Sequence, residues 1–555
     1  MSVARNGRGA DHHAALVQHF AATVSHPLRD AAADEVHRLT ERMGGRARMR
    51  TVVILACILG LSTADLGAVA AVAVQLEQGL RVGNADIGLM VTVSSLIGAT
   101  FTVPVGALTD RFRRVTLLWV SIALWTVAEA GSALAPTFGV LLATRVALGA
   151  VTATAGPTVA SLVGDLFAPR ERGRMWGFIL TGELLGAGAG VLVAGLATSL
   201  FGWRAALMVL AVPAGVLSLV VRRYLPEPER GGQSWLPPGN DQPPVGDEVG
   251  TKADRPGDDS PEERSDGLVH QVEDRGIRPE PSIVVHGDAS RMNLWEAVRY
   301  VLRVRTNLVL IVASSLGYFF FTGLETFAIV FLKGQYGVNA GMATLVLLAV
   351  GAGAVAGVLV AGHMGDALIC RGHLDARLLI GAVGFIGSAV VLAPAILSNV
   401  LALSVPLFVV AGFAVATPNP SLDAARLDVV PGHLWGRAEG VRTLLRQSLQ
   451  ALAPLLFGIV SASLGGSQAG FASGVNAGHA AVSPAGTSGL QYTFLIMLVP
   501  VVAGGLLLLA GRRSYPVDVV SAAESDRGSV SGSGSSSMPS QPPRREASLK
   551  GPRGA

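Results

Sequence analysis

Twelve apolar stretches of about 20 residues run through this chain, and they restrict its fold more than any other feature. A helix of about 20 apolar residues crosses the ~30 Å hydrocarbon core of a bilayer. Half of the 555 residues are hydrophobic and only 15% are charged, which excludes an ordinary soluble enzyme. We place the spans roughly at 52–75, 86–109, 115–134, 137–163, 175–199, 203–223, 307–331, 341–363, 377–398, 401–418, 440–463 and 490–511.

A polar stretch rich in Pro, Gly, Asp, Glu and Arg divides these spans into two sets of six. Such a composition cannot bury enough apolar surface to order itself. The sequence therefore predicts an all-α membrane protein of two six-helix bundles. Its expected parts are a cytoplasmic N-terminal segment (1–50), an N-terminal bundle (51–224), a disordered linker (225–292), a C-terminal bundle (293–513) and a disordered tail (514–555).

Two sets of marks indicate that the halves are repeats of each other. A Gly-x-x-x-Asp turn occurs at 106–110 and again at 362–366, an offset of 256 residues. A second set, offset by 263, matches Pro157, Asp165, Gly173 and Arg174 with Pro420, Asp428, Gly436 and Arg437. Together with the hydropathy, these marks favour parallel repeats related by an axis along the membrane normal.

Arginine residues gather in alternate loops, for example at 46–50, 111–114 and 170–174. By the positive-inside rule, both termini and the linker are expected in the cytoplasm. These loops account for the net charge of +4, so no nucleic-acid partner is required. The two cysteines, Cys57 and Cys370, lie near apolar stretches and suggest neither a disulfide nor a metal site.

The loop after the second span, from Gly106 to Arg114, resembles the signature loop between helices 2 and 3 of the major facilitator superfamily. Gly106 permits close helix approach, and Asp110 can accept charge-assisted hydrogen bonds at a helix end. Arg111 and Arg114 are expected to anchor the loop at the cytoplasmic surface. With Asp366 of the second copy, these residues form the expected conformational gate.

Within the superfamily, the chain resembles the Spinster-like branch, which is associated with lysophospholipid, sphingosine-phosphate and related amphiphile transport. Asp65 in the first span, Arg145 in the fourth and the Asp165-Leu-Phe167 stretch carry this likeness. The resemblance implies that Asp65 and Arg145 face each other. Asp65 would then exchange a proton, and Arg145 would tune its proton affinity through opposite charge. A static buried ion pair is the alternative interpretation.

Other polar residues within the spans are candidates because an ionisable group at bilayer depth is costly unless it is paired or faces water. Glu325 lies among aromatic residues and could meet a cationic headgroup or carry a proton. Glu183 could pair with Arg446, which stands at the equivalent repeat position, and Thr152 stands where the branch often has Glu. These four are the candidate substrate-binding residues. We interpret Glu129 as a polar residue near a helix end at the outer interface.

The sequence thus predicts a secondary active transporter, not an enzyme, that moves an amphipathic organic solute such as a lysophospholipid by alternating access. The proton gradient would drive it, with no cofactor and no metal. A drug or metabolite proton antiporter is an alternative, because Gly182-x-x-x-Gly186-x-x-x-Gly190 resembles the antiporter motif. A non-transporting sensor or scaffold is the alternative of another class. We expect a monomer in the plasma membrane, with the bilayer and a small substrate as its partners.

Overall fold

The computed structural model describes residues 37–38, 40–41, 43–82, 84–230, 236, 267–285, 292–464 and 484–534. In these residues all regular structure is helical, and twelve segments are long and apolar enough to cross a membrane. The all-α, twelve-span prediction is confirmed. The expected N-terminal segment before residue 37, most of the linker, the loop at 465–483 and the tail after 534 lie outside the described residues.

Each half of the chain supplies six spans, and in each half one span consists of two consecutive helices. The first half contains α2 (Arg46–Leu80), α3 (Asn84–Arg111), α4 (Arg114–Ala133), α5 (Phe138–Thr152), α6 (Ala155–Leu166), α7 (Arg172–Phe201) and α8 (Trp203–Tyr224). The second half contains α12 (Arg305–Tyr336), α13 (Ala340–Cys370), α14 (Ala376–Leu397), α15 (Leu401–Ala416), α16 (Pro418–Val429), α17 (Trp435–Ser463) and α19 (Pro484–Gly511). A short helix, α11 (Leu294–Arg303), precedes the second half.

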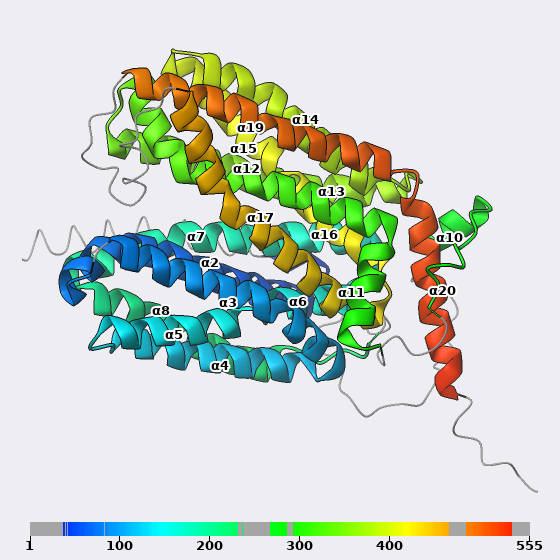
Figure 1. Cartoon of the computed structure of the whole chain (residues 1–555). Helices are drawn as coiled ribbons and strands as arrows, with labels where there is room; N and C mark the ends of the chain where they lie inside the picture. The colour runs from blue at the N-terminus through cyan, green and yellow to red at the C-terminus, as the bar shows by residue number, and fades with distance from the viewer. Residues whose placement is uncertain are drawn as a thin grey trace, which may run out of the picture.

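The two halves lie side by side and converge at one end of the molecule, at the right of Figure 1. There α3 packs against α17 and α7 packs against α13, so each contact joins one half to the other. This end carries Gly106–Asp110 and its repeat at 362–366, which are helical, inside α3 and α13, and not the expected turns; it also carries the C-terminal helix α20 (Tyr515–Gly534). We call it the closed end. At the opposite end the ribbons of the two halves diverge.

The fourth and tenth expected spans are each broken in two, and both extend beyond the predicted ends. In the fourth span, α5 gives way to α6 at residues 153–154. In the tenth, α15 gives way to α16 at Thr417, and α16 continues to Val429 instead of ending at 418. Proline lacks a backbone donor and crowds the carbonyl four residues before it. Pro157 and Pro418 therefore account for both breaks.

Close packing of α2 against α7 depends on glycine. A Cβ atom added at Gly182 would lie 2.6 Å from the Cβ of Ala56, and one at Gly67 would lie 2.7 Å from the backbone oxygen of Ala187. Residues without a side chain let the two backbones approach within van der Waals range. The helix face formed by Gly182, Gly186 and Gly190 is thus a packing surface.

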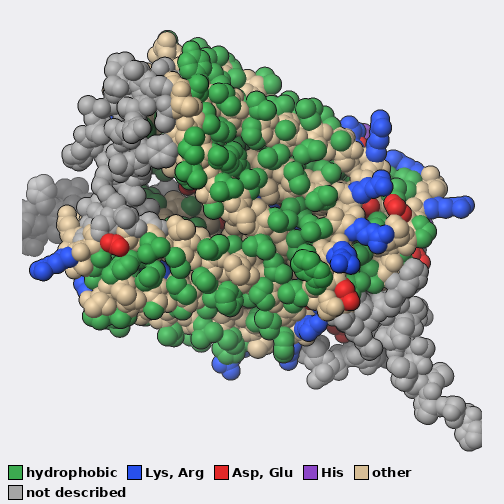
Figure 2. Space-filling view, in the orientation of Figure 1, with side chains coloured by type: hydrophobic (Ala, Val, Ile, Leu, Met, Phe, Trp, Pro, Cys, Tyr) green, Lys and Arg blue, Asp and Glu red, His purple; other side chains and the backbone are tan. Residues whose placement is uncertain are grey.

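The outer surface has the polarity expected of a chain that spans a bilayer. Figure 2 shows hydrophobic side chains over most of the visible flank, whereas Lys and Arg side chains gather at the closed end. On the outer faces of α7 and α8, leucines such as Leu192, Leu196 and Leu219 are more than 60% exposed. In water such a surface would be strongly unfavourable, so lipid is the solvent that suits it.

The disordered tail expected from residue 514 is a wrong prediction for its first part. Residues 515–534 form α20, whose Tyr515, Val519 and Val520 are buried against the closed end. The Asp518 carboxylate accepts a hydrogen bond from the backbone N–H of Thr306 at 2.8 Å. The apolar residues Val517, Val519 and Val520 carried this signal, and the Ser and Gly content of the segment that follows obscured it.

Two pieces of the expected linker are likewise ordered. Glu227 accepts hydrogen bonds from the backbone N–H groups of Arg114 and Val115 at 2.8 Å, and so caps α4. A second piece forms α10 (Gly267–Asp274), which packs against α20. The linker prediction is therefore wrong at both of these places, because a few specific polar contacts order a segment that has little apolar surface.

Candidate functional site

Two aspartates at the closed end hold the helix termini of the opposite half. Asp110 at the end of α3 accepts hydrogen bonds from the backbone N–H groups of Gly436 and Arg437 at 2.8 and 3.0 Å. These groups begin α17, where the helix dipole and the unpaired N–H groups favour a negative charge. Asp110 is 3% exposed, so water does not compete for these bonds.

Asp366 makes the equivalent contact in the other repeat. It accepts hydrogen bonds from the backbone N–H groups of Gly173 and Arg174, at 3.2 and 2.7 Å, at the start of α7. The donors of the two clamps stand 263 residues apart, the offset found in the sequence. We call these two sets of bonds the closed-end clamps. Gly106 allows the approach, because a Cβ atom added there would lie 2.9 Å from the carbonyl carbon of Gly436.

Behind each clamp lies a buried ion pair that is also repeated at an offset of 263. Arg114 pairs with Asp165 in the first half, and Arg377 pairs with Asp428 in the second. Arg172 of the first half also reaches Asp428, at 3.2 Å. The expectation that Arg114 anchors at the cytoplasmic surface is wrong, since it is only 2% exposed and its partner Asp165 is buried beside it.

Arg111, in contrast, is exposed, and its Nη2 donates to the backbone oxygen of Met292 at 3.4 Å. Met292 precedes the second half, so this contact also crosses between the halves. The tail adds a further connection, because the Tyr515 hydroxyl donates to Asp428 at 2.7 Å. All five predicted gate residues therefore lie at the closed end, and none of them borders the central cavity described below.

The predicted pair of Asp65 and Arg145 is close in space and has a third member. Nη1 of Arg145 lies 2.7 Å from Oδ1 of Asp65, and Nη2 lies 3.2 Å from Oε1 of Glu129. All three side chains are less than 10% exposed. The interpretation of Glu129 as a residue of the outer interface is wrong. We call Asp65, Glu129 and Arg145 the ion triad.

A second set of buried charges, in the C-terminal half, was not predicted from the sequence. Arg426 and Arg442 each contact both Asp423 and Glu439, at distances from 2.5 to 3.3 Å. Thr443 donates a further hydrogen bond to Glu439 at 3.1 Å. The two guanidinium groups and two carboxylates thereby neutralise each other within one compact cluster.

Between the halves lies a polar cavity of about 320 Å³, a volume typical of small-molecule sites. Side chains of both halves border it, including Asp65 of the ion triad and Asp423, Glu439 and Arg442 of the buried cluster. Its other hydroxyl, amide and charged side chains come from α2, α3, α5, α7, α12 and α17: Ser62, Thr63, Ser94, Ser95, Thr102, Thr152, Glu183, Tyr318, Thr443, Arg446, Gln447 and Gln450.

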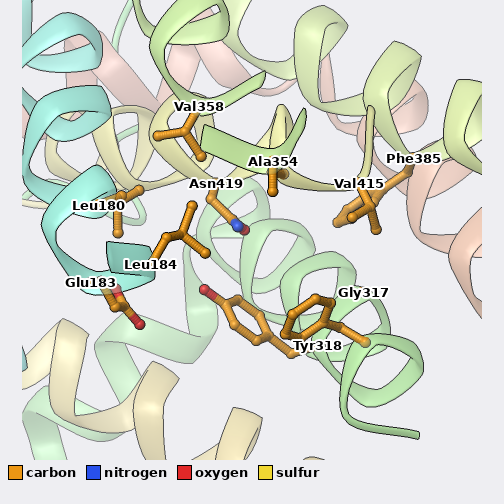
Figure 3. A pocket seen from close by; sticks show the side chains of 12 residues that line it. Leu180, Glu183, Leu184, Gly317, Tyr318, Ala354, Val358, Phe385, Val415 and Asn419 are labelled. Carbon is orange, nitrogen blue, oxygen red and sulfur yellow. The ribbon is translucent and has the colours of Figure 1, made fainter. Parts of the chain in front are cut away.

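A smaller, mostly apolar pocket of about 100 Å³ adjoins this cavity. Leu180, Glu183 and Tyr318 border both spaces, so the two lie next to each other. Figure 3 shows the side chains of α7 at one side of the pocket and Phe385 at the other, with Tyr318 pointing between them. The remaining apolar lining comes mainly from α12, α13 and α15: Phe321, Ala354, Val358, Val415 and Ala416.

Three of the four predicted substrate-binding residues border the central cavity: Thr152, Glu183 and Arg446. The guanidinium of Arg446 lies 4.3 Å from the centre of the Tyr318 ring, a cation–π contact. No ion pair within 4.0 Å joins Arg446 to Glu183 in the described residues, although both border the same space. Glu325 lies two helical turns beyond Tyr318 on α12 and borders neither of the two spaces described here.

Among the described residues, no group of three or more His, Cys, Asp or Glu side chains is arranged to hold a metal ion. The polar lining of the cavity instead consists of hydroxyl, amide, carboxylate and guanidinium groups. Such groups bind polar or charged parts of an organic molecule by hydrogen bonds and ion pairs.

These features define a class of membrane protein: twelve spans in two repeated bundles, joined at one end and enclosing a polar cavity at their interface. The chain belongs to the Major Facilitator Superfamily, whose family model matches residues 55–454.

Several curated proteins are similar to part of this chain. Protein spinster homolog 1 of Homo sapiens is 32% identical over 214 residues, which is 37% of this chain and 40% of that protein. Protein spinster homolog 3 of Danio rerio is 29% identical over 210 residues, 37% of this chain and 41% of that protein. A chloramphenicol efflux pump of Mycobacterium tuberculosis is 31% identical over 178 residues, 31% of this chain and 42% of that protein. The matched region spans about two fifths of each relative.

A solved structure has the same fold. It is a bacterial homolog to the human lysosomal transporter Spinster, in an inward-facing and occupied conformation. It covers 85% of this chain and 98% of its own, at 17% identity and a TM-score of 0.50. The resemblance to the Spinster branch drawn from the sequence is thus confirmed by the curated relatives, and the fold by this structure.

Proposed function

We propose that this chain is a secondary transporter that moves an amphipathic organic solute, such as a lysophospholipid, by alternating access and is driven by protons. One observation carries the proposal: a polar cavity at the interface of the halves lies next to a mostly apolar pocket, with which it shares lining residues. A solute with a polar headgroup and an apolar chain matches this division. Members of the superfamily are transporters and not enzymes, as the sequence led us to expect.

Among the described residues that border the cavity, Arg446 is a cation with no carboxylate oxygen within 4.0 Å. Arg426 and Arg442 are neutralised within their cluster, whereas the guanidinium of Arg446 lies over the Tyr318 ring. Its Nε is buried without a hydrogen-bond partner among the described residues. An anionic or zwitterionic headgroup would supply that partner. Glu183, across the same space, suits the cationic part of a zwitterion.

Alternating access requires one end of the cavity to close while the other opens. The closed-end clamps supply such a closure, because each joins the halves through hydrogen bonds that a rocking motion would break. We place the closed end in the cytoplasm of a plasma-membrane protein, since the arginine-rich loops and both ends of the chain belong to that side by the positive-inside rule. A monomer contains the whole cavity.

A drug or metabolite antiporter is the second candidate. The similarity to a chloramphenicol efflux pump favours it. An apolar pocket of about 100 Å³ accommodates an aromatic group as well as a short piece of alkyl chain. A non-transporting sensor or scaffold has no need for the buried charges of the ion triad, whose desolvation is costly.

Uptake by the purified protein in proteoliposomes tests these alternatives. Labelled lysophosphatidylcholine, lysophosphatidylglycerol, chloramphenicol and glucose would each be assayed with and without an imposed pH gradient. We expect gradient-dependent transport of the lysolipids, and a decrease of about tenfold or more in Arg446→Gln for the anionic one. Arg299→Gln, on an exposed face of α11, is the matched control. Transport of chloramphenicol alone would favour the antiporter, and transport of none of the four would contradict the proposal.

A further inference from the structure

The ion triad contains one cation and two carboxylates, and all three side chains are largely buried. Glu129 on α4 is fully buried, Arg145 on α5 is 3% exposed, and the side chain of Asp65 on α2 is 9% exposed. Among the described residues, Asp65 and Arg145 are the charged groups that act on Glu129 from the helices packed around it. Arg145 therefore has to serve both carboxylates alone.

Charge balance limits how many of these groups can be ionised together. If both carboxylates were ionised, the triad would hold a net negative charge in a region of low dielectric, which is strongly unfavourable. One proton bound to either carboxylate makes the triad neutral. Oε2 of Glu129 has no hydrogen-bond partner among the described residues, so the contact of Oε1 with Arg145 is the one that stabilises a negative charge on this carboxylate there.

The two carboxylates differ in their access to water. Asp65 borders the central cavity, and Arg145 approaches it more closely, at 2.7 Å against 3.2 Å for Glu129. Glu129 does not border the cavity. Asp65 is thus the group that can exchange a proton with the cavity, whereas Glu129 is enclosed.

We propose that Asp65 and Glu129, which both contact Arg145, share one proton, so that Glu129 keeps the buried guanidinium paired whenever Asp65 is protonated. With Asp65 ionised, Arg145 pairs with Asp65 and the proton resides on Glu129. When Asp65 takes up the proton, Glu129 ionises and becomes the partner of Arg145. Without Glu129, protonation of Asp65 would leave a buried guanidinium with no counter-charge, which is a costly state. This assignment rests on the proton coupling proposed above.

Infrared spectroscopy of the purified full-length protein tests the shared proton without any substrate. A protonated carboxyl group absorbs at the C=O stretch of a carboxylic acid, and an ionised one does not. Difference spectra at pH 7 would compare the parent with Asp65→Asn, with Glu129→Gln and with Glu524→Gln, an exposed carboxylate of α20. We expect one carboxylic-acid band to be lost in each of the first two variants, because the remaining carboxylate then ionises to pair with Arg145. The control should retain it.

Two results would overturn the proposal. If the parent and Glu129→Gln have the same carboxylic-acid absorption, both carboxylates are ionised in the parent. If Asp65→Asn retains the whole band, Glu129 holds its own proton independently of Asp65. Should Glu129→Gln not yield folded protein, the Asp65→Asn comparison decides alone, since loss of the band on removal of the other carboxylate is the mark of sharing.

A second measurement separates this inference from the proposed function. In proteoliposomes, Glu129→Gln should move the pH profile of gradient-driven lysolipid uptake to lower pH by about one unit or more, because Asp65 must then be protonated beside an uncompensated Arg145. An unshifted profile with intact uptake would contradict the role of Glu129 while leaving proton coupling in place. Loss of the band without any gradient-driven uptake in the parent would support the shared proton and refute the coupling.

Discussion

Replacing Asp110 with Asn measures how far the closed-end clamps stabilise the closed conformation. The buried carboxylate accepts two backbone hydrogen bonds, at 2.8 and 3.0 Å, and lies 3.2 Å from Nε of Arg437. A hydrogen bond to a charged group contributes about 1.5–3 kcal/mol. Asn keeps one acceptor oxygen but loses the charge, so we expect the closed state to lose roughly 2–3 kcal/mol relative to the open one. At 1.36 kcal/mol per factor of ten, the ratio of closed to open molecules should decrease by about 30- to 150-fold.

Distances between spin labels across the closed end report this change directly. Phe112 at the end of α3 is 58% exposed, and Cys370 at the end of α13 is exposed in the other half. Labels on Phe112→Cys and on the native Cys370, with Cys57→Ser, would give a single short-distance population in the parent. Asp110→Asn should add a longer-distance population of comparable or greater size.

A matched control is Asp274→Asn, since this carboxylate of α10 is 68% exposed at the same end of the molecule. It should leave the distance distribution unchanged. Asp366→Asn should act in the same direction as Asp110→Asn, because it weakens the equivalent clamp of the other repeat. If the distribution of Asp110→Asn superimposes on that of the parent, the clamp contributes less than the hydrogen-bond energies require, and the reasoning fails.

The remaining predictions concern packing, docking of the tail and the linker. Gly182→Ala should lower the free energy of unfolding by roughly 1–3 kcal/mol, because the added Cβ would lie 2.6 Å from that of Ala56. Gly188→Ala, on the same helix, should leave it unchanged, because a Cβ there meets nothing within 4 Å. Thermal unfolding of both variants in detergent makes the comparison. Burial raises the pKa of Asp526 from 3.8 to about 7. The docked α20 therefore keeps a proton on Asp526 that the free helix would release, so docking should weaken as the pH rises from about 4 to about 7. Hydrogen exchange of the α20 backbone amides, corrected for intrinsic rates, should show this pH dependence in the parent. The dependence should be absent in Asp526→Asn. Shortening residues 237–266 should preserve expression and uptake, because the entropy cost of loop closure depends weakly on loop length. Deletion of 227–236 should lower both, because it removes Glu227, which caps α4. Well-expressed but inactive protein after the first deletion would show that residues 237–266 do more than connect the two halves.

Hydropathy and repeated motifs were sufficient to predict the spans, the two halves and the acidic residues of both clamps. These predictions succeeded for physical reasons. The bilayer imposes a length on each helix, and an acidic side chain near the N-terminus of a helix is stabilised by the helix dipole. The position of Glu129 within its own span, near the helix end, did not predict that it pairs with Arg145. Glu129 lies four residues before the end of α4, and Arg145 lies seven residues after the start of α5. Counting both ways from the α4–α5 turn puts them within about one helical turn in depth, which would have paired them.

The cluster around Glu439 and Arg442 was missed for a different reason. We ended the tenth span at residue 418 and began the eleventh at 440, whereas α16 continues to Val429 and α17 begins at Trp435, so Asp423, Arg426 and Glu439 were assigned to a loop. Glu439, Arg442 and Arg446 recur at intervals of three and four residues, which places them on one helix face. The tail helix α20 was missed because its contacts with Asp428 and Gly432 join residues far apart in the sequence.

The donors of the closed-end clamps are backbone groups, and this has a consequence for which mutations the protein can accept. Every amino acid except proline supplies the same N–H at position 174, so the identity of Arg174 is not fixed by its bond to Asp366. At Gly173 and Gly436 only size is restricted, since an added Cβ would lie 2.8 and 2.5 Å from the carboxylates they serve. Saturation mutagenesis should therefore give unequal profiles across each clamp: Asp110 and Asp366 intolerant of nearly all replacements, the glycines intolerant in proportion to bulk, and position 174 sensitive chiefly to proline.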